Sequence, residues 1–136
     1  MGKWYSRPVL FVADLERSLE FYIGQLGFDE IWRHAEDGNL LVAQVDRGGC
    51  ELILSSQWPE NVGSGLIFIS LDPDDMLVVR HSFERRGVAV TDGWWGYRLM
   101  IVQDPDGNQL YFPYGDVGTV SAERPEDRAS PSAGSH

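Results

Sequence analysis

The sequence predicts an α+β protein made of two β-α-β-β-β modules. Short apolar runs typical of strands alternate with two longer segments whose apolar residues recur at helical spacing. The order strand, helix, strand, strand, strand occurs twice along the chain. The two halves share this order but not their residues, and an internal repeat of this kind indicates two similar modules. At 136 residues, the chain has the length of one compact domain.

The first module covers about residues 7–56. Residues 8–12 (PVLFV) form a short apolar run, which predicts a buried strand. Asp14 can accept hydrogen bonds from the free amides at the start of a helix, and Gly27 can adopt the left-handed conformation that ends one. The apolar stripe of this helix comprises Leu15, Leu19, Tyr22, Ile23 and Leu26. Three strands are then expected at residues 28–34, 40–46 and 50–55.

The second module covers about residues 65–115. Residues 65–71 (GLIFISL) predict a strand, and residues 72–87 predict a helix that ends at Gly87. Pro105 and Gly107 suit a tight turn, because proline presets one backbone angle and glycine permits a positive φ. The buried face of the helix comprises Met76, Val79, Phe83 and the stem of Arg80. The last three strands are expected at residues 88–92, 98–103 and 109–114.

Residues 1–116 are therefore predicted to form a single domain that contains both modules. Residues 117–136 differ in composition, because they are small, polar and proline-containing. Such a segment has few groups to bury, so it is predicted to be a flexible tail. Function is expected to lie in the domain.

The composition excludes two classes of partner. The formal net charge is −10 and the eleven Lys and Arg residues are scattered, so the surface repels phosphate backbones and anionic lipids. Neither nucleic acid nor a membrane is expected as a partner. The negative charge attracts a basic or polar ligand, although acidic surface residues can also serve solubility alone.

A single cysteine, Cys50, excludes an internal disulfide framework. It lies in the strand-like run CELIL and is interpreted as a small core residue rather than a nucleophile. No stretch approaches the ~20 apolar residues of a membrane-spanning helix, and charge occurs too early for a signal-peptide core. A cytoplasmic location is therefore expected.

Two segments resemble the signatures of a known superfamily. Residues 11–28 (FVADLERSLEFYIGQLGF) are similar to the opening strand-helix signature of the vicinal oxygen chelate superfamily, and residues 95–112 (WGYRLMIVQDPDGNQLYF) to its closing signature. This superfamily contains glyoxalases, dioxygenases, fosfomycin-modifying enzymes and bleomycin resistance proteins, and the chain most resembles the bleomycin-resistance-like members. The resemblance implies curved sheets around a cleft and a homodimer with clefts at or near the subunit interface.

Alternation along the strands predicts which face of each sheet is buried, because neighbouring side chains point to opposite faces. One parity is uniformly apolar and should pack on the helices: Leu10, Val12, Leu52, Leu54, Ile67, Ile69, Leu71, Leu110 and Phe112. The other parity mixes polar, charged and apolar residues, as a ligand-facing surface does: Arg7, Val9, Phe11, Glu51, Ile53, Ser55, Leu66, Phe68, Ser70, Gln109 and Tyr111.

The resemblance also implies where a metal would bind. Metal-dependent members place His or Glu on the inner face of the first and fourth strands of each module, and the matching positions here are Arg7, Glu51, Leu66 and Tyr111. Arginine and leucine offer no lone pair to a metal, so one carboxylate and one phenol remain. Divalent transition metals require three or four well-placed donors. The sequence therefore predicts no metal and no cofactor.

Arg7 and Glu51 are instead predicted to form an ion pair in the place of the metal. The pair either neutralises two partly buried charges or contacts a polar ligand. Aromatic rings complete the expected site: Trp32, Trp95, Phe68 and Tyr111 are the candidate ligand contacts, since their flat faces suit planar or cationic molecules. Three other tryptophans are expected to pack in the core or at an interface: Trp4, Trp58 and Trp94.

Three functions remain open at this point. The first is a metal-independent protein that binds a small cationic or aromatic molecule, such as a bleomycin-type antibiotic, without changing it. The second is a metal-independent lyase or isomerase that uses Glu51 as the base and Tyr111 as the acid. The third, and least supported, is a metal-dependent glyoxalase or dioxygenase.

Overall fold

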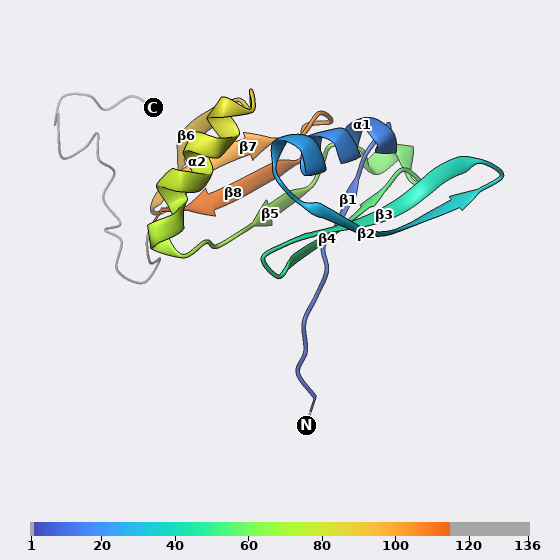
Figure 1. The fold of residues 1–136 in the computed structure, drawn as a ribbon, viewed down its shortest axis with the longest axis horizontal. Helices are drawn as coiled ribbons and strands as arrows, with labels where there is room; N and C mark the ends of the chain where they lie inside the picture. The colour runs from blue at the N-terminus through green and yellow to red at the C-terminus, as the bar shows by residue number, and fades with distance from the viewer. Residues whose placement is uncertain (1, 115–136) are drawn as a thin grey trace, which may run out of the picture.

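The computed structural model describes residues 2–114, which contain both predicted modules (Figure 1). The predicted tail at 117–136 lies outside the described residues. Each module has the predicted order of one strand, one helix and three strands. A short 3-10 helix, η2 (Pro59–Asn61), lies between the two modules, and another, η3 (Pro73–Asp75), directly precedes the second helix.

Each module folds into one four-stranded mixed sheet. In the first sheet the order is β1-β4-β3-β2, and in the second it is β5-β8-β7-β6. The first strand of each module pairs in parallel with the last, and the other pairs are antiparallel. The first sheet comprises β1 (Val9–Phe11), β2 (Asp29–Glu36), β3 (Asn39–Arg47) and β4 (Cys50–Ser55). The second comprises β5 (Leu66–Phe68), β6 (Val90–Trp94), β7 (Arg98–Gln103) and β8 (Gln109–Pro113).

The first helix begins as predicted but changes geometry halfway. Asp14 caps α1 (Leu15–Leu19) by accepting a hydrogen bond from the Arg17 amide at 3.2 Å. The chain then continues as the π-helix η1 (Glu20–Gln25) rather than as a regular α-helix. A π-turn shifts the later side chains relative to α-helical spacing. This corrects the predicted stripe, because Phe21 is buried and Ile23 is only half-buried.

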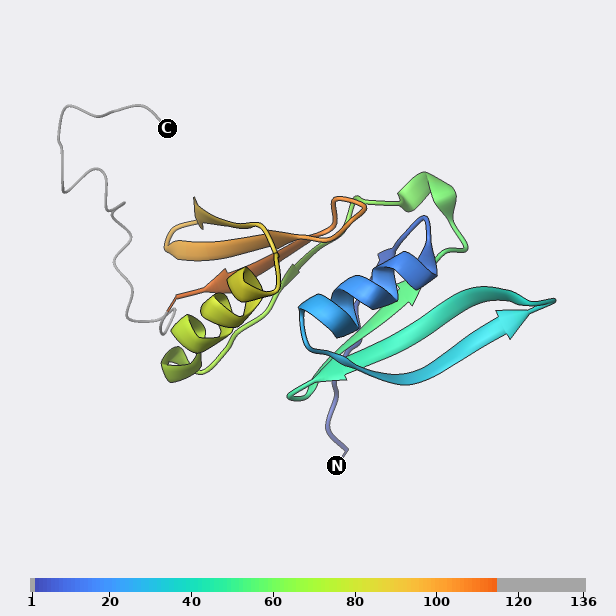
Figure 2. The ribbon, with the colours of Figure 1, turned by 45° about the horizontal axis from the view of Figure 1, so that its top comes forward.

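The second helix, α2 (Met76–Arg85), buries the three apolar residues predicted for it: Met76, Val79 and Phe83. Figure 2 shows α1 and α2 on the same side of the two sheets. Neither helix, nor any other in residues 2–114, is long and apolar enough to cross a membrane.

The predicted alternation of buried and open faces is confirmed. Six residues of the apolar parity are 0–3% exposed: Leu10, Val12, Leu52, Leu54, Leu110 and Phe112. Ile67, Ile69 and Leu71 are partly buried against the same core. Ser55 is the exception in the other parity, because it is buried and its hydroxyl accepts a hydrogen bond from the Gln57 amide. We call the sheet surface that faces away from α1 and α2 the open face.

The turn at residues 104–108 joins the two modules. Asn108 donates to the Phe11 carbonyl at 3.0 Å and accepts from the Gly65 amide at 2.8 Å. The buried Tyr22 hydroxyl donates to Asp104 at 3.0 Å, across 82 residues of sequence. Because these bonds link the first module to the last hairpin, the modules pack as one unit.

Candidate ligand-binding site

The six residues predicted to contact a ligand lie on the open face, in two groups. Arg7, Trp32 and Glu51 belong to the first module, whereas Phe68, Trp95 and Tyr111 belong to the second. Side-chain alternation places Glu51, Phe68 and Tyr111 opposite the buried parity of their strands. Unlike the core residues, Phe68 and Trp95 have exposed side chains, at 39% and 54%.

The second module gathers its aromatic residues into one cluster. Phe68 and Tyr111 are register partners in the parallel pair of β5 and β8. The Trp95 ring lies 5.6 Å from both of their ring centroids, and it meets Tyr111 edge to face. Tyr97, which the sequence analysis missed, adds a further edge contact to Phe68 at 5.9 Å. We call these four residues the aromatic cluster.

The turn between β6 and β7 positions Trp95 in the cluster. Its amide donates to the Tyr97 carbonyl at 3.0 Å, and Gly96 between them has a φ of +79°. Glycine permits this left-handed conformation without strain. Trp94 occupies the last position of β6, opposite Arg98, and is half-buried, in agreement with its predicted packing role.

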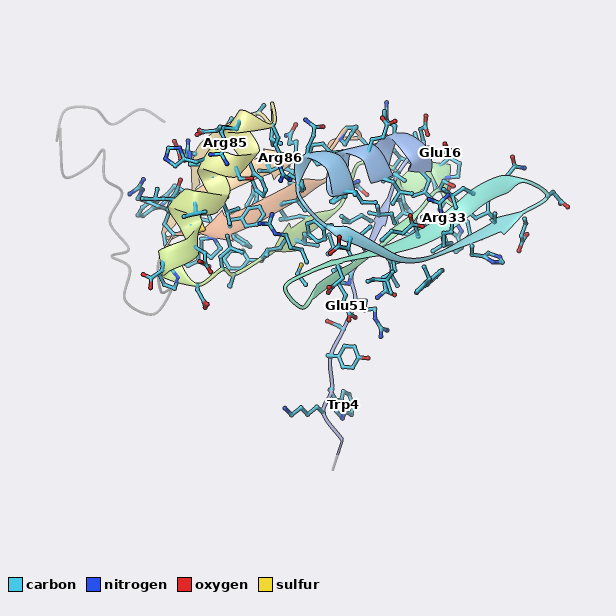
Figure 3. The ribbon with its side chains drawn as sticks, in the orientation of Figure 1. Trp4, Glu16, Arg33, Glu51, Arg85 and Arg86 are labelled. Carbon is cyan, nitrogen blue, oxygen red and sulfur yellow. The ribbon has the colours of Figure 1, made fainter. Side chains whose placement is uncertain are left out.

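The predicted ion pair between Arg7 and Glu51 is confirmed. Arg7 Nε lies 2.7 Å from Glu51 Oε1, and both side chains remain about one-third exposed, at 39% and 32%. Tyr5, also missed by the sequence analysis, accepts from Arg7 Nη2 at 2.9 Å, and its ring lies beneath the guanidinium at 4.9 Å. The hydrogen bond to Glu51 raises the pKa of Arg7 above its usual value. Figure 3 shows Glu51 beside the N-terminal segment.

Trp32 is held by a buried partner. Its indole Nε1 donates to Gln44 Oε1 at 2.8 Å, and Gln44 is only 6% exposed. Trp58 packs edge to face on Phe11 at 5.6 Å, as expected for a packing residue. Trp4 is 98% exposed and extends away from both sheets, so it does not pack in the core, and packing at an interface stays a prediction for it (Figure 3).

The four positions implied as metal ligands do not fit a metal. The Glu51 carboxylate is already bonded to Arg7, Leu66 has no donor atom, and Tyr111 packs on Trp95. Within residues 2–114, no three His, Cys, Asp or Glu side chains come together in a group that could hold an ion. We therefore derive no chemistry through a metal at these positions.

Glu51 and Tyr111, the base and acid of the alternative enzyme, lie on different sheets of one chain. Glu51 lies on β4 in the first sheet, and Tyr111 lies on β8 in the second. No hydrogen bond connects the two side chains among the described residues, and Glu51 is engaged by Arg7.

Comparisons with known proteins agree with this architecture. A family model described as the Glyoxalase/Bleomycin resistance protein/Dioxygenase superfamily matches residues 4–112. No curated protein matches the sequence. Among solved structures, TnmS3, an antibiotic binding protein from Streptomyces sp. CB03234, is 25% identical with a TM-score of 0.67, and the match covers 85% of this chain and 99% of that one.

Two further solved structures share the fold. The bleomycin-binding protein of Streptomyces verticillus, complexed with copper(II)-bleomycin, is 25% identical with a TM-score of 0.66, covering 85% of this chain and 100% of that one. The fosfomycin resistance protein FosX of Listeria monocytogenes is 15% identical with a TM-score of 0.62, covering 86% and 94%. At that identity FosX shows the fold alone. From the family match and the two-module fold, the chain belongs to the glyoxalase/bleomycin resistance protein/dioxygenase superfamily.

Proposed function

We propose that this protein binds an aromatic small molecule with a positive charge and sequesters it without changing it chemically. The observation that carries the proposal is the aromatic cluster of Phe68, Trp95, Tyr97 and Tyr111, which is open to solvent on the open face. Large apolar rings exposed together on a protein surface are typical of a binding site. Arg7, Glu51 and Trp32 supply polar and aromatic contacts from the first module.

Charge supports a cationic ligand. The formal net charge of −10 attracts cations over the whole surface, and indole and phenol faces attract cations at short range. Two solved structures of the same fold belong to antibiotic-binding proteins, one of them complexed with copper(II)-bleomycin. A bleomycin-type antibiotic is therefore the first ligand that we propose.

We further propose that the active species is a homodimer in the cytoplasm. The aromatic cluster and the Arg7–Glu51 pair lie on different sheets, so one chain presents two halves of a site. Exposed apolar residues of the first and second sheets, Val9 and Leu66, lie on the open face and suit burial against a second copy. The free thiol of Cys50 is compatible with a reducing compartment.

Tryptophan fluorescence tests the proposal. Bleomycin and a panel of neutral, anionic and cationic aromatic compounds are titrated into the protein, and the recovered compounds are analysed by mass spectrometry. We expect saturable quenching by cationic aromatic compounds, with the compound recovered intact. Formation of a product, or equal response to all charges, would contradict sequestration of a cation.

Two variants locate the site. Trp95→Ala removes the central ring of the aromatic cluster and should weaken binding about 30-fold, since a desolvated cation–π contact contributes about 2 kcal/mol. Trp58→Ala is the matched control, because Trp58 is similarly exposed but packs on Phe11 outside the cluster. Equal losses in the two variants would place the ligand elsewhere.

A further inference from the structure

A cavity lies on the helix side of the molecule, away from the open face. It has a volume of about 410 Å³ and lies between the β3–β4 turn of the first module and α2 of the second. This volume falls in the range of small-molecule sites. The floor is apolar and comprises Phe28, Cys50, Leu71, Val79, Phe83 and Phe112.

The cavity explains an incomplete burial in the fold. Ile69 and Leu71 belong to the apolar parity of the second module, but both are only partly buried. Both line the cavity. Within residues 2–114, no protein group completely covers the apolar surface of these two residues.

The positive charge at this cavity comes from Arg47. Its side chain is half-buried and lines the cavity, and Nη1 donates to the Leu26 carbonyl at 2.5 Å. A Cβ added to Gly27 would lie 3.0 Å from Arg47 Nη1 and 3.3 Å from Arg86 Nη1, so the two guanidinium groups converge beside Gly27. Figure 3 shows Arg86 at the end of α2.

Neither guanidinium has an acidic partner in the described part of the chain, where every ion pair within 4.0 Å involves other arginines or His34. The carbonyl of Leu26 uses one of the five donors of Arg47. A half-buried guanidinium with free donors beside an apolar cavity suits an oxyanion, which it can bind through two parallel hydrogen bonds.

Acidic residues at the other end of the cavity favour one orientation of a bound anion. Asp72 and Asp75 line it near the start of α2, and both are exposed. Carboxylates are stabilised there by the positive end of the helix dipole and by water, so they need no ligand. They repel an anion from their own end and thereby direct it toward Arg47.

We propose that this cavity binds a small apolar or aromatic carboxylate, with the carboxylate on Arg47 and the apolar body on Phe28, Val79, Phe83 and Phe112. The site goes beyond the proposed function, since it lies on the other side of the sheets and takes a ligand of opposite charge. Loss of either site leaves the other intact.

Cys50 supplies a reporter for this cavity alone, because it is the only cysteine of the chain and it lines the cavity. The full-length protein is alkylated with iodoacetamide, a neutral reagent, with and without 1-naphthoate, 1-naphthalenemethanol or 1-naphthylmethylammonium. The rate at Cys50 is followed by mass spectrometry. At about ten times its Kd, a ligand that covers the thiol should slow alkylation about tenfold, because only free protein reacts.

We expect protection by naphthoate, weaker protection by the neutral alcohol and least by the cation. Stronger protection by the cation would show that Asp72 and Asp75 set the specificity and would overturn the proposal. An alkylation rate that none of the three compounds changes, measured relative to the rate without any compound, would also overturn it.

Two pairs of variants test the geometry. Val78 is exposed on α2 and lines the cavity, so Val78→Trp should fill its mouth and abolish protection, whereas Leu77→Trp on the neighbouring position should not.

Arg47→Gln should weaken naphthoate binding about tenfold or more, since hydrogen bonds to charged groups are the stronger class. Arg85→Gln, at an exposed residue outside the cavity, should leave it unchanged. Cation titrations at the aromatic cluster should be the same in all four variants.

Discussion

Trp32 and Trp95 illustrate two ways in which this chain fixes an exposed indole ring. A hydrogen bond from Nε1 to the buried Gln44 sets the orientation of Trp32, whereas ring contacts with Phe68 and Tyr111 set that of Trp95. In both cases the ring is ordered before a ligand arrives. Preorganisation of this kind lowers the entropy that binding must offset.

Tyr22 makes a buried hydrogen bond that contributes to the stability of the fold. Burial, followed by the adjacent Asp104 carboxylate, raises the pKa of Tyr22 well above its usual value, so the phenol remains protonated and donates. Tyr22→Phe should lower the free energy of unfolding by about 1.5–3 kcal/mol, the range for a hydrogen bond to a charged group. Urea unfolding of the parent protein and the variant measures this difference in free energy. Tyr97→Phe is the control, since no hydrogen bond of its hydroxyl is found in residues 2–114, and a similar loss there would contradict the assignment.

At the scale of the element, sequence patterns predicted the order of strands and helices, whereas the strand expected at 65–71 is observed only as Leu66–Phe68 and that expected at 88–92 as Val90–Trp94. The predicted strand at 98–103 is β7 as observed, and the alternation of β4 and β8 placed their buried faces correctly. The Arg7–Glu51 pair also followed from strand positions alone. The π-turn at Glu20–Gln25 was missed because its residues keep an apolar spacing compatible with an α-helix.

The residues missed in the site have a common physical reason. Tyr97 joins the aromatic cluster through the conformation of the β6–β7 turn, and Tyr5 reaches Arg7 from a segment outside the strands. Gln44 differs from its neighbours only in polarity, and its role depends on a cross-strand contact with Trp32. Periodicity describes strands, whereas these contacts depend on turns and rotamers.

The contact between α2 and β6 gives a pH-dependent prediction. Arg80 lies 2.7 Å from Asp92, and this hydrogen bond lowers the pKa of Asp92. A carboxyl group with a lower pKa in the folded state stabilises the fold at neutral pH, and that contribution is lost as the pH falls through the lowered value. Asp92 is 63% exposed, so Asp92→Asn should cost no more than about 1 kcal/mol at pH 7.

The cost of Asp92→Asn should shrink in urea unfolding series as the pH is lowered below about 4, where Asp92 begins to protonate in the unfolded chain. Asp74→Asn, at an exposed residue without an ion pair in the described structure, is the control. A cost that stays constant with pH would contradict the electrostatic origin.

At the scale of the whole molecule, the junction between modules gives a sharp test. Gly63 and Gly38 both have a φ of +79°, but only at Gly63 would an added Cβ overlap another residue, at the backbone oxygen of Asp106. Gly38→Ala should cost about 1 kcal/mol from backbone strain. Gly63→Ala should cost about 1–3 kcal/mol more, because a backbone atom must move. Thermal and urea unfolding of both variants measure the two losses in free energy of unfolding. Equal losses would contradict close packing of the two modules at Gly63.

The proposed homodimer is tested by sedimentation velocity. We expect the full-length chain to sediment at twice its mass of 15.3 kDa. Leu66→Arg places a charge on the open face and should shift the protein to monomer, whereas Leu77→Arg on the helix side should not. A monomeric parent protein would remove the second half of the proposed ligand site.

Metal-independent binding at the aromatic cluster is tested by calorimetric titration of metal-free bleomycin into the full-length protein in the presence of a strong chelator. We expect saturable binding without any added metal, loss of affinity in Trp95→Ala, and recovery of unaltered bleomycin from the complex. A requirement for a divalent ion, or unchanged affinity in Trp95→Ala, would contradict it.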